Sequence, residues 1–183
     1  MKYQIGEPDE LCQYPVTIPG GGYIGHVFRW HKYWWAVEAG SGQETRHLKN
    51  GKADKVTGQE KAALYLATRA ANGLITPTKA PEPTPFEAMA EPPLLHPRMK
   101  DTPGNRQHAQ EVDELLALQL WTRESGFPGT DNPMRVKCQD GWRGILYWSH
   151  LRGRNNKAPS LFRHEECTVR DQVRARDPRY RAV

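Results

Sequence analysis

The sequence contains no apolar run near the roughly 20 residues that a membrane-spanning helix needs. Its first 16 residues, MKYQIGEPDELCQYPV, lack the basic start and apolar centre of a secretory signal. Only three cysteines occur (Cys12, Cys138 and Cys167), an odd number at wide spacing that does not suit a disulfide framework. We therefore expect free thiols, no membrane contact, and a cytoplasmic location in a bacterium or a phage-infected host cell.

Catalytic signatures are also missing. There is no G-x-S-x-G nucleophile motif and no Walker loop, and the glycine-rich PGGGYIG lacks the lysine and the following helix of a phosphate-binding loop. Zinc-binding residue types occur at Cys138, His150, His164 and Cys167, but no C-x-x-C pair is present and HEEC is the single close pair. We expect a protein that is not an enzyme and has no cofactor; the spacing argues against zinc without deciding the question.

What the chain does have is an uneven basic charge. The 183 residues include 26 Lys and Arg against 21 Asp and Glu, a net charge of +5. Residues 143–183 carry ten of these cations and four of the acids, which favours an anionic partner for the C-terminal end. The main candidates for phosphate contact there are Arg143, Arg152, Arg154, Lys157 and Arg163. A solvated basic face, or an acidic protein partner, would fit the same charges.

A proline-rich stretch divides the chain. Residues 77–106 contain eight prolines, whose fixed φ and missing N–H exclude helix interiors and central strands. We expect a linker there, between a domain at 1–76 and a domain at 107–170, with a basic tail or a short surface helix at 171–183. The predicted fold class is α+β, with two small domains.

The first domain should be a three-stranded antiparallel sheet with one helix. Strand-forming residues fill 21–30, 33–39 and 43–49, with turn residues between them. Thr57 and Glu60 have the spacing of a helix capping box, and Gly73 can end that helix. Side-chain alternation predicts that Trp35 faces the helix and that Trp34 faces away from it.

The second domain should be a helix followed by a small curled β-sheet. Val112, Leu115, Leu116 and Leu120 recur at helical spacing, and Gly126 can end the helix. The runs MRVKC, WRGILYW and SLFRHEECTVR are typical of strands, and QDG between the first two predicts a tight turn.

Residues 22–73, with their order of three strands and a helix and their W-x-A and AALYLA patterns, resemble the arm-type DNA-binding domain of phage integrases and the plant ethylene-response-factor domain. In those families the sheet enters the major groove of DNA. The resemblance implies that Arg29, Lys32, Trp34 and Arg46 face the groove, although Glu38 and Glu44 beside them weaken the phosphate footprint. Core packing is the alternative for the tryptophans, above all for Trp30 and Trp35.

The sequence thus predicts a non-enzymatic binding protein of phage or mobile-element type. Its partner would be nucleic acid or a nucleic-acid-processing protein of host or phage, engaged through basic and aromatic surfaces. A protein–protein adaptor or inhibitor of a host enzyme is the first alternative, and a structural component of a virion is the second. The partner, the choice of DNA or RNA, the oligomeric state and the source stay open.

Overall fold

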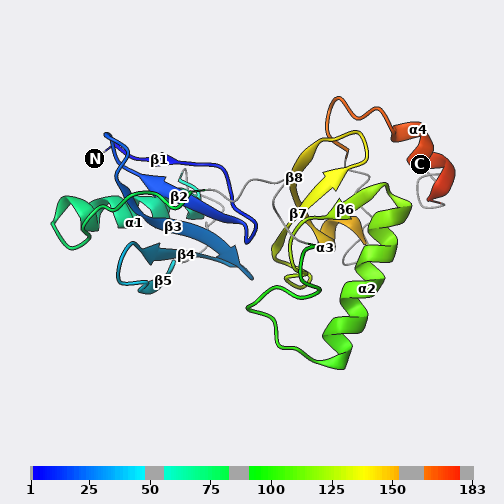
Figure 1. Cartoon of the computed structure of the whole chain (residues 1–183), viewed down its shortest axis with the longest axis horizontal. Helices are drawn as coiled ribbons and strands as arrows, with labels where there is room; N and C mark the ends of the chain where they lie inside the picture. The colour runs from blue at the N-terminus through cyan, green and yellow to red at the C-terminus, as the bar shows by residue number, and fades with distance from the viewer. Residues whose placement is uncertain (1, 48–55, 83–90, 153–162, 178–183) are drawn as a thin grey trace. The chain divides into compact units, whose positions relative to one another are not determined.

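A computed structural model describes residues 2–47, 56–82, 91–152 and 163–177. The chain divides into two compact units, 1–88 and 89–183. Each unit pairs an antiparallel β-sheet with helices, which confirms the predicted α+β class (Figure 1). None of the helices in the described ranges is long and apolar enough to cross a membrane.

The N-terminal unit has five strands rather than the predicted three. Their order in the sheet is β1 (Gln4–Ile5), β2 (Gln13–Thr17), β3 (Tyr23–Trp30), β4 (Tyr33–Glu38) and β5 (Glu44–His47), and every neighbouring pair is antiparallel. The two strands that were not predicted are β1, which has two residues, and β2, which contains polar residues and a proline, so their composition did not indicate strands. Pro15 is tolerated in β2 because its carbonyl, and so its missing N–H, faces the side of β1, which pairs only with Val16 and Thr17 and has ended at this position.

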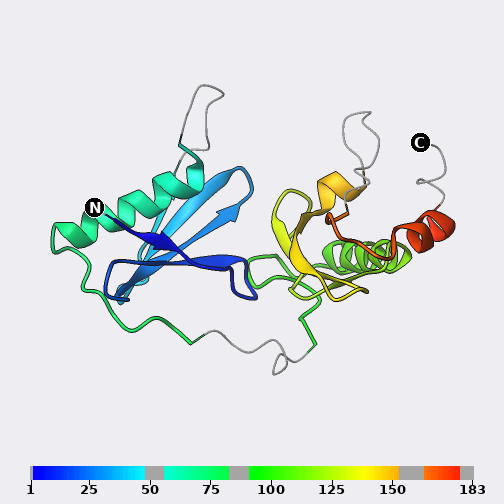
Figure 2. The ribbon, with the colours of Figure 1, turned by 90° about the horizontal axis from the view of Figure 1, so that it is seen from above.

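The predicted helix is present as α1 (Gly58–Ala71), which crosses one face of this sheet (Figure 2). The Thr57 hydroxyl accepts from the backbone N–H of Glu60, and the Glu60 carboxylate accepts from the N–H of Thr57, so the capping box is confirmed. Ala62, Ala63, Leu66 and Ala67 are buried against the sheet. Four small or aliphatic side chains let the helix backbone come close to the strands.

The predicted face assignment of β4 is wrong. Glu38 pairs with Arg69 of α1, and Ala36 and Trp34 pack with the core beneath the helix, so the even-numbered residues face α1. Trp35 lies on the other face, where its ring stacks on that of Phe28. The small helix residues therefore meet a largely aliphatic sheet face, and the larger aromatic stack forms on the opposite side.

The C-terminal unit consists of α2 (Pro103–Leu118) packed on the sheet β6 (Trp121–Arg123), β7 (Pro133–Cys138) and β8 (Arg143–Tyr147), with α3 (Trp148–Leu151) and α4 (Arg170–Arg176) beside them (Figure 1). The helix ends before the predicted Gly126, because Leu120 takes a left-handed conformation (φ 57°) and turns the chain into β6. Its buried residues Ala109, Val112 and Leu116 face the sheet.

Part of the predicted linker belongs to this second unit. The N–H of His96 donates to the carbonyl of Phe127 at 3.0 Å, and the N–H of Phe127 donates to Leu94 at 3.1 Å. Leu94 and Leu95 pack against the core, and the burial of their apolar side chains holds this proline-rich segment on the unit. The proline content alone had predicted an extended linker. A Cβ at Gly126 would lie 2.6 Å from backbone atoms of residues 95 and 96, so the close approach depends on this glycine.

Near the C-terminus one predicted strand is wrong, and one of two alternatives for the following segment is observed. The stretch 163–169 forms turns, not a strand, and leads into α4. Residues 171–177 are no loose tail, because Val173 is fully buried and the Asp177 carboxylate accepts from the Gln119 side chain at 3.2 Å. Val169 and Val173, four residues apart, supply the apolar face that the surrounding charges conceal in the sequence.

Candidate functional site

The candidate DNA-contacting residues of the N-terminal unit do not form one row. Arg29 lies directly opposite Trp34 and donates from Nε to the carbonyl of His31 at 3.2 Å. Lys32 is exposed at the turn between β3 and β4, with its ammonium 5.4 Å from the Tyr33 ring centroid. Trp34 is half-buried on the α1 side and tilts against Tyr14, which places it in the core rather than on an open surface. Arg46 pairs with Trp35 in the backbone register, and its side chain is outside the described set.

The C-terminal candidates differ in their exposure to solvent. Arg143 and Arg152 are exposed, whereas Arg163 is buried, with its guanidinium 4.5 Å from the Trp121 ring centroid. Arg163 therefore cannot serve as a surface contact for phosphate, which corrects the prediction. Arg154 and Lys157 lie outside the described residues.

The structure adds two cations that the sequence reading overlooked. Residues Met134, Val136 and Cys138 of β7 point into the core, so the alternating Arg135 and Lys137 point out. Lys137 lies directly opposite Arg143 of β8. We call Arg135, Lys137 and Arg143 the basic sheet face. The alternation in MRVKC was the available signal, but it was used only to predict a strand.

The basic sheet face contains one acidic neighbour that the contacts define. Glu124 follows β6 and accepts from Arg143 Nε at 2.9 Å. Like charges directly opposite each other on a sheet are destabilising. Among the described residues, the outward face of this hairpin thus gathers three cations, a charge pattern that favours an anion spanning several residues.

A second constellation lies at the turn of the same hairpin, next to the Lys137–Arg143 pair. Cys138, Asp140, His164 and Cys167 have their side-chain donor atoms within 4.8 Å of one another. We call these four residues the Cys-Asp-His-Cys cluster. Cys138, His164 and Cys167 were considered from the sequence as zinc ligands. His150, which was considered with them, is not part of the cluster: it is exposed on α3, and its ring centroid lies 5.2 Å from that of Tyr147.

Two turns assemble this cluster. In the first, the N–H of Cys138 donates to the carbonyl of Trp142 at 2.7 Å, and Gly141 adopts the positive φ of 101° that the turn requires. In the second, the N–H of Cys167 donates to the carbonyl of His164 at 3.1 Å. Each turn contributes two side chains. The QDG sequence predicted the first turn, but its aspartate was read only as a turn residue.

Asp140 holds the two turns together. Its carboxylate accepts from the N–H of Trp142 at 3.1 Å and from the N–H of Thr168 at 3.2 Å, and lies 2.9 Å from His164 Nε2. Burial alone would raise the pKa of Asp140, but these hydrogen bonds and the nearby histidine outweigh it and lower the pKa to about 2. The carboxylate is therefore ionised near neutral pH.

Aromatic rings and a buried cation surround the cluster. His164 stacks on Trp142 with ring centroids 4.9 Å apart and planes inclined by 6°, and Trp121 contacts Trp142 edge to face at 5.7 Å. Arg163 Nη1 lies 3.9 Å from Cys138 Sγ, and its Nη2 donates to the carbonyl of Gln119. Burial raises the pKa of the Cys138 thiol to about 11, with Arg163 acting in the opposite direction.

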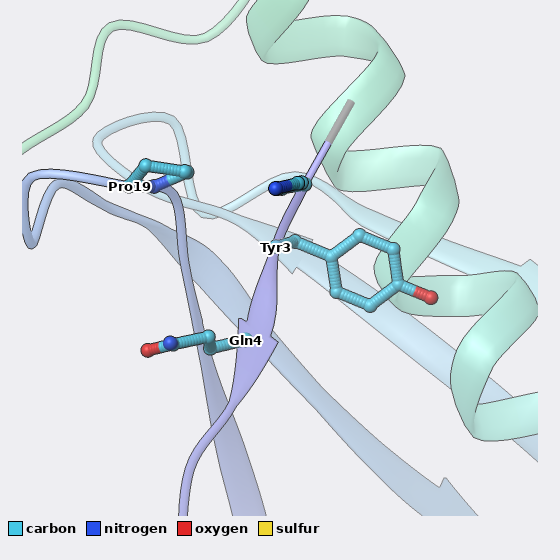
Figure 3. A pocket seen from close by; sticks show the side chains of 4 residues that line it. Tyr3, Gln4 and Pro19 are labelled. Carbon is cyan, nitrogen blue, oxygen red and sulfur yellow. The ribbon is translucent and has the colours of Figure 1, made fainter.

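A hollow on the N-terminal unit has little chemical character. It is lined by Lys2, Tyr3, Gln4 and Pro19, and Figure 3 shows the Tyr3 ring against α1 while Gln4 points elsewhere. The Tyr3 hydroxyl lies 3.4 Å from the carbonyl of Glu60. No set of converging titratable groups appears among its lining residues, so we do not treat it as a catalytic site.

Comparison of the chain with known protein families, with curated proteins and with solved structures finds no match. The function must therefore be argued from the basic sheet face and the cluster themselves.

Proposed function

We propose that the protein is a non-enzymatic nucleic-acid-binding protein whose C-terminal unit contacts the phosphate backbone through the basic sheet face. The observation that carries the proposal is the direct cross-strand pairing of Lys137 with Arg143, with Arg135 two residues along the same face. Their mutual repulsion lowers the stability of the free protein, and a polyanion lying across them relieves it. Phosphate contact of this kind supplies affinity without reading the base sequence.

The neighbouring surface extends this footprint. Ile145 and Tyr147 alternate with the inward residues of β8 and share the outward face with Arg143. Arg152, exposed at the end of α3, follows in the chain. A partly exposed tyrosine beside cations can stack on an unpaired base, so single-stranded nucleic acid is the preferred form of the ligand.

The N-terminal unit would add a second contact through Arg29 and Lys32 at the β3–β4 hairpin. The likeness to the integrase arm-type and ethylene-response-factor domains motivates this part of the proposal, although the unit has five strands. We place the activity in the cytosol of a bacterium or a phage-infected cell, in keeping with the three free cysteines.

Binding is tested with the full chain and labelled single strands and duplexes of unrelated sequence, by fluorescence anisotropy over a series of salt concentrations. Replacing Arg135, Lys137 and Arg143 together by serine should weaken binding to all sequences about equally. On duplex DNA, the slope of log K against the logarithm of the salt concentration should also become less negative by roughly 0.9 for each lost phosphate contact.

The matched control replaces Lys2, Lys79 and Lys100 by serine, because all three are exposed and the same net charge is removed from scattered places. This variant should keep most of the affinity. Equal losses in both triple variants would show that only net charge matters and would overturn the assignment of the surface.

A complete lack of binding at low salt, where electrostatic attraction is strongest, would overturn the function itself. The adaptor or inhibitor alternative predicts instead a protein partner that stays bound at high salt in nuclease-treated lysate. Co-purification with virus particles is the outcome expected of a virion component.

A further inference from the structure

We propose that the Cys-Asp-His-Cys cluster binds one zinc ion as a structural site that fastens the turn of the β7–β8 hairpin to the segment before α4. The inference does not depend on nucleic-acid binding, and it goes against the expectation drawn from ligand spacing. It rests on the donor types, on their geometry and on the charge of the surrounding residues.

The donor types fit zinc and few other common ions. Two thiolates, one imidazole and one carboxylate form a mixed soft and borderline set, whereas calcium and magnesium take oxygen ligands. Tetrahedral zinc with bonds of about 2.0–2.3 Å separates its ligand atoms by roughly 3.3–3.8 Å. The four donor atoms lie within 4.8 Å of one another, and the His164–Asp140 contact is 2.9 Å, so rearrangement by about 1 Å would complete the shell.

Arg163 provides the second line of argument. Its side chain is 7% exposed, its Nε has no hydrogen-bond partner among the described residues, and Nη1 lies 3.9 Å from Cys138 Sγ. Among the described residues the guanidinium contacts the Gln119 carbonyl, the Trp121 ring and Cys138 Sγ, and no carboxylate pairs with it. Zinc bound by two thiolates and a carboxylate carries a net charge of about −1, which Arg163 would balance while donating to the ligand sulfur.

The arrangement indicates a structural role for the metal. All four side chains come from the protein, Cys138, His164 and Cys167 are buried, and the Trp142 ring covers one side of His164. Four protein ligands leave no open position for a substrate or water, unlike a catalytic site. The second turn precedes α4 directly, so zinc would tie the position of that helix to the sheet.

Two metal-free alternatives make different predictions. In the first, the His164–Asp140 ion pair is the whole purpose of the cluster and the thiols stay free. In the second, Cys138 and Cys167 form a disulfide in an oxidised state of the protein. Zinc protection of both thiols, with a cobalt–thiolate spectrum, is expected only for the metal site.

The test uses the full wild-type chain, purified under reducing conditions and divided into chelator-treated and zinc-loaded samples. We expect one zinc per chain, and slower alkylation of Cys138 and Cys167 in the zinc-loaded sample, read by peptide mass spectrometry. Cys12, a buried free cysteine of the other unit, is the internal control and should react equally in both samples. Cobalt should give a thiolate charge-transfer band and the strong visible absorption of tetrahedral coordination.

Variants complete the test. Cys167→Ser should abolish the cobalt–thiolate band or weaken metal affinity at least tenfold. Cys12→Ser should leave both the band and the affinity unchanged. Because Cys167→Ser could also fail to fold, the alkylation result on wild-type protein decides the matter. Equal alkylation rates with and without zinc, octahedral cobalt without a thiolate band, or a Cys138–Cys167 disulfide in protein isolated in parallel without reductant would each overturn the proposal.

Discussion

Glu38 of β4 and Arg69 of α1 form an ion pair in which Oε1 and Nε are 2.6 Å apart, and the Glu38 side chain is 4% exposed. A second oxygen of the same carboxylate lies 3.3 Å from Arg69 Nη2, and the Tyr65 hydroxyl lies 3.4 Å from the first. This buried carboxylate fixes which side of the sheet α1 covers. Glu38 has the same parity in β4 as Trp34, which side-chain alternation had placed away from the helix, and its contact with Arg69 shows the opposite.

Removing the arginine of this pair should loosen α1. Arg69→Ala leaves the Glu38 carboxylate buried without its cation, which we expect to cost about 2–3 kcal/mol of stability in the N-terminal unit. Hydrogen exchange of the α1 amides measures the loss. The control is Lys79→Ala, which breaks an exposed pair with Glu82 and should change stability by less than about 0.5 kcal/mol. Unchanged exchange in Arg69→Ala would mean that the pair does not hold the helix.

The two neighbouring tryptophans should differ in their effect on α1. Trp34→Ala opens space in the core beneath the helix and should speed exchange of its amides, at a cost of about 2–3 kcal/mol. Trp35→Ala removes the stack on Phe28, on the opposite face, and should leave α1 exchange nearly as in wild type. The reverse pattern would restore the face assignment that side-chain alternation first suggested.

The segment at residues 94–99 should resist proteases better than the residues nearer the N-terminal unit. Trypsin should cut after Lys79 before it cuts after Arg98, because the N–H groups of Arg98 and Met99 donate to His96 in a tight turn. Gly126→Ala should speed the cut after Arg98, since the new Cβ collides with residues 95 and 96.

Gly104→Ala is the matched control for this experiment, because a Cβ at that position meets no atom within 4 Å. It should leave the trypsin pattern unchanged. Early cleavage after Arg98 in the wild-type chain would show that the segment is not held in solution.

The last helix should contribute to stability despite its charge. Val173→Ala should destabilise the C-terminal unit by about 2 kcal/mol, because the side chain is fully buried in the core. Arg174→Ala, one residue further on the exposed side, should change stability by less than about 0.5 kcal/mol. Urea unfolding followed by circular dichroism compares the two, and equal small effects would contradict the packing of α4.

Local signals were read correctly where a few neighbouring residues decide the outcome. Thr57 and Glu60 cap a helix through bonds within one turn, and QDG forms the tight turn between β7 and β8. Predictions failed where distant contacts decide. The Leu94–His96 segment looks extended from its prolines but docks on Phe127, and Val173 lies among charges that hide its burial.

The sequence by itself determined the α+β class, the extent of α1, the β7–β8 hairpin and the concentration of positive charge near the C-terminus. These follow from periodicity, capping and turn chemistry, which act over a few residues. Only the tertiary structure decided that α1 covers the Trp34 face, that Lys137 meets Arg143, and that Asp140 joins Cys138, His164 and Cys167. Such encounters depend on how elements distant in the chain pack together, and residue spacing carries no record of that packing.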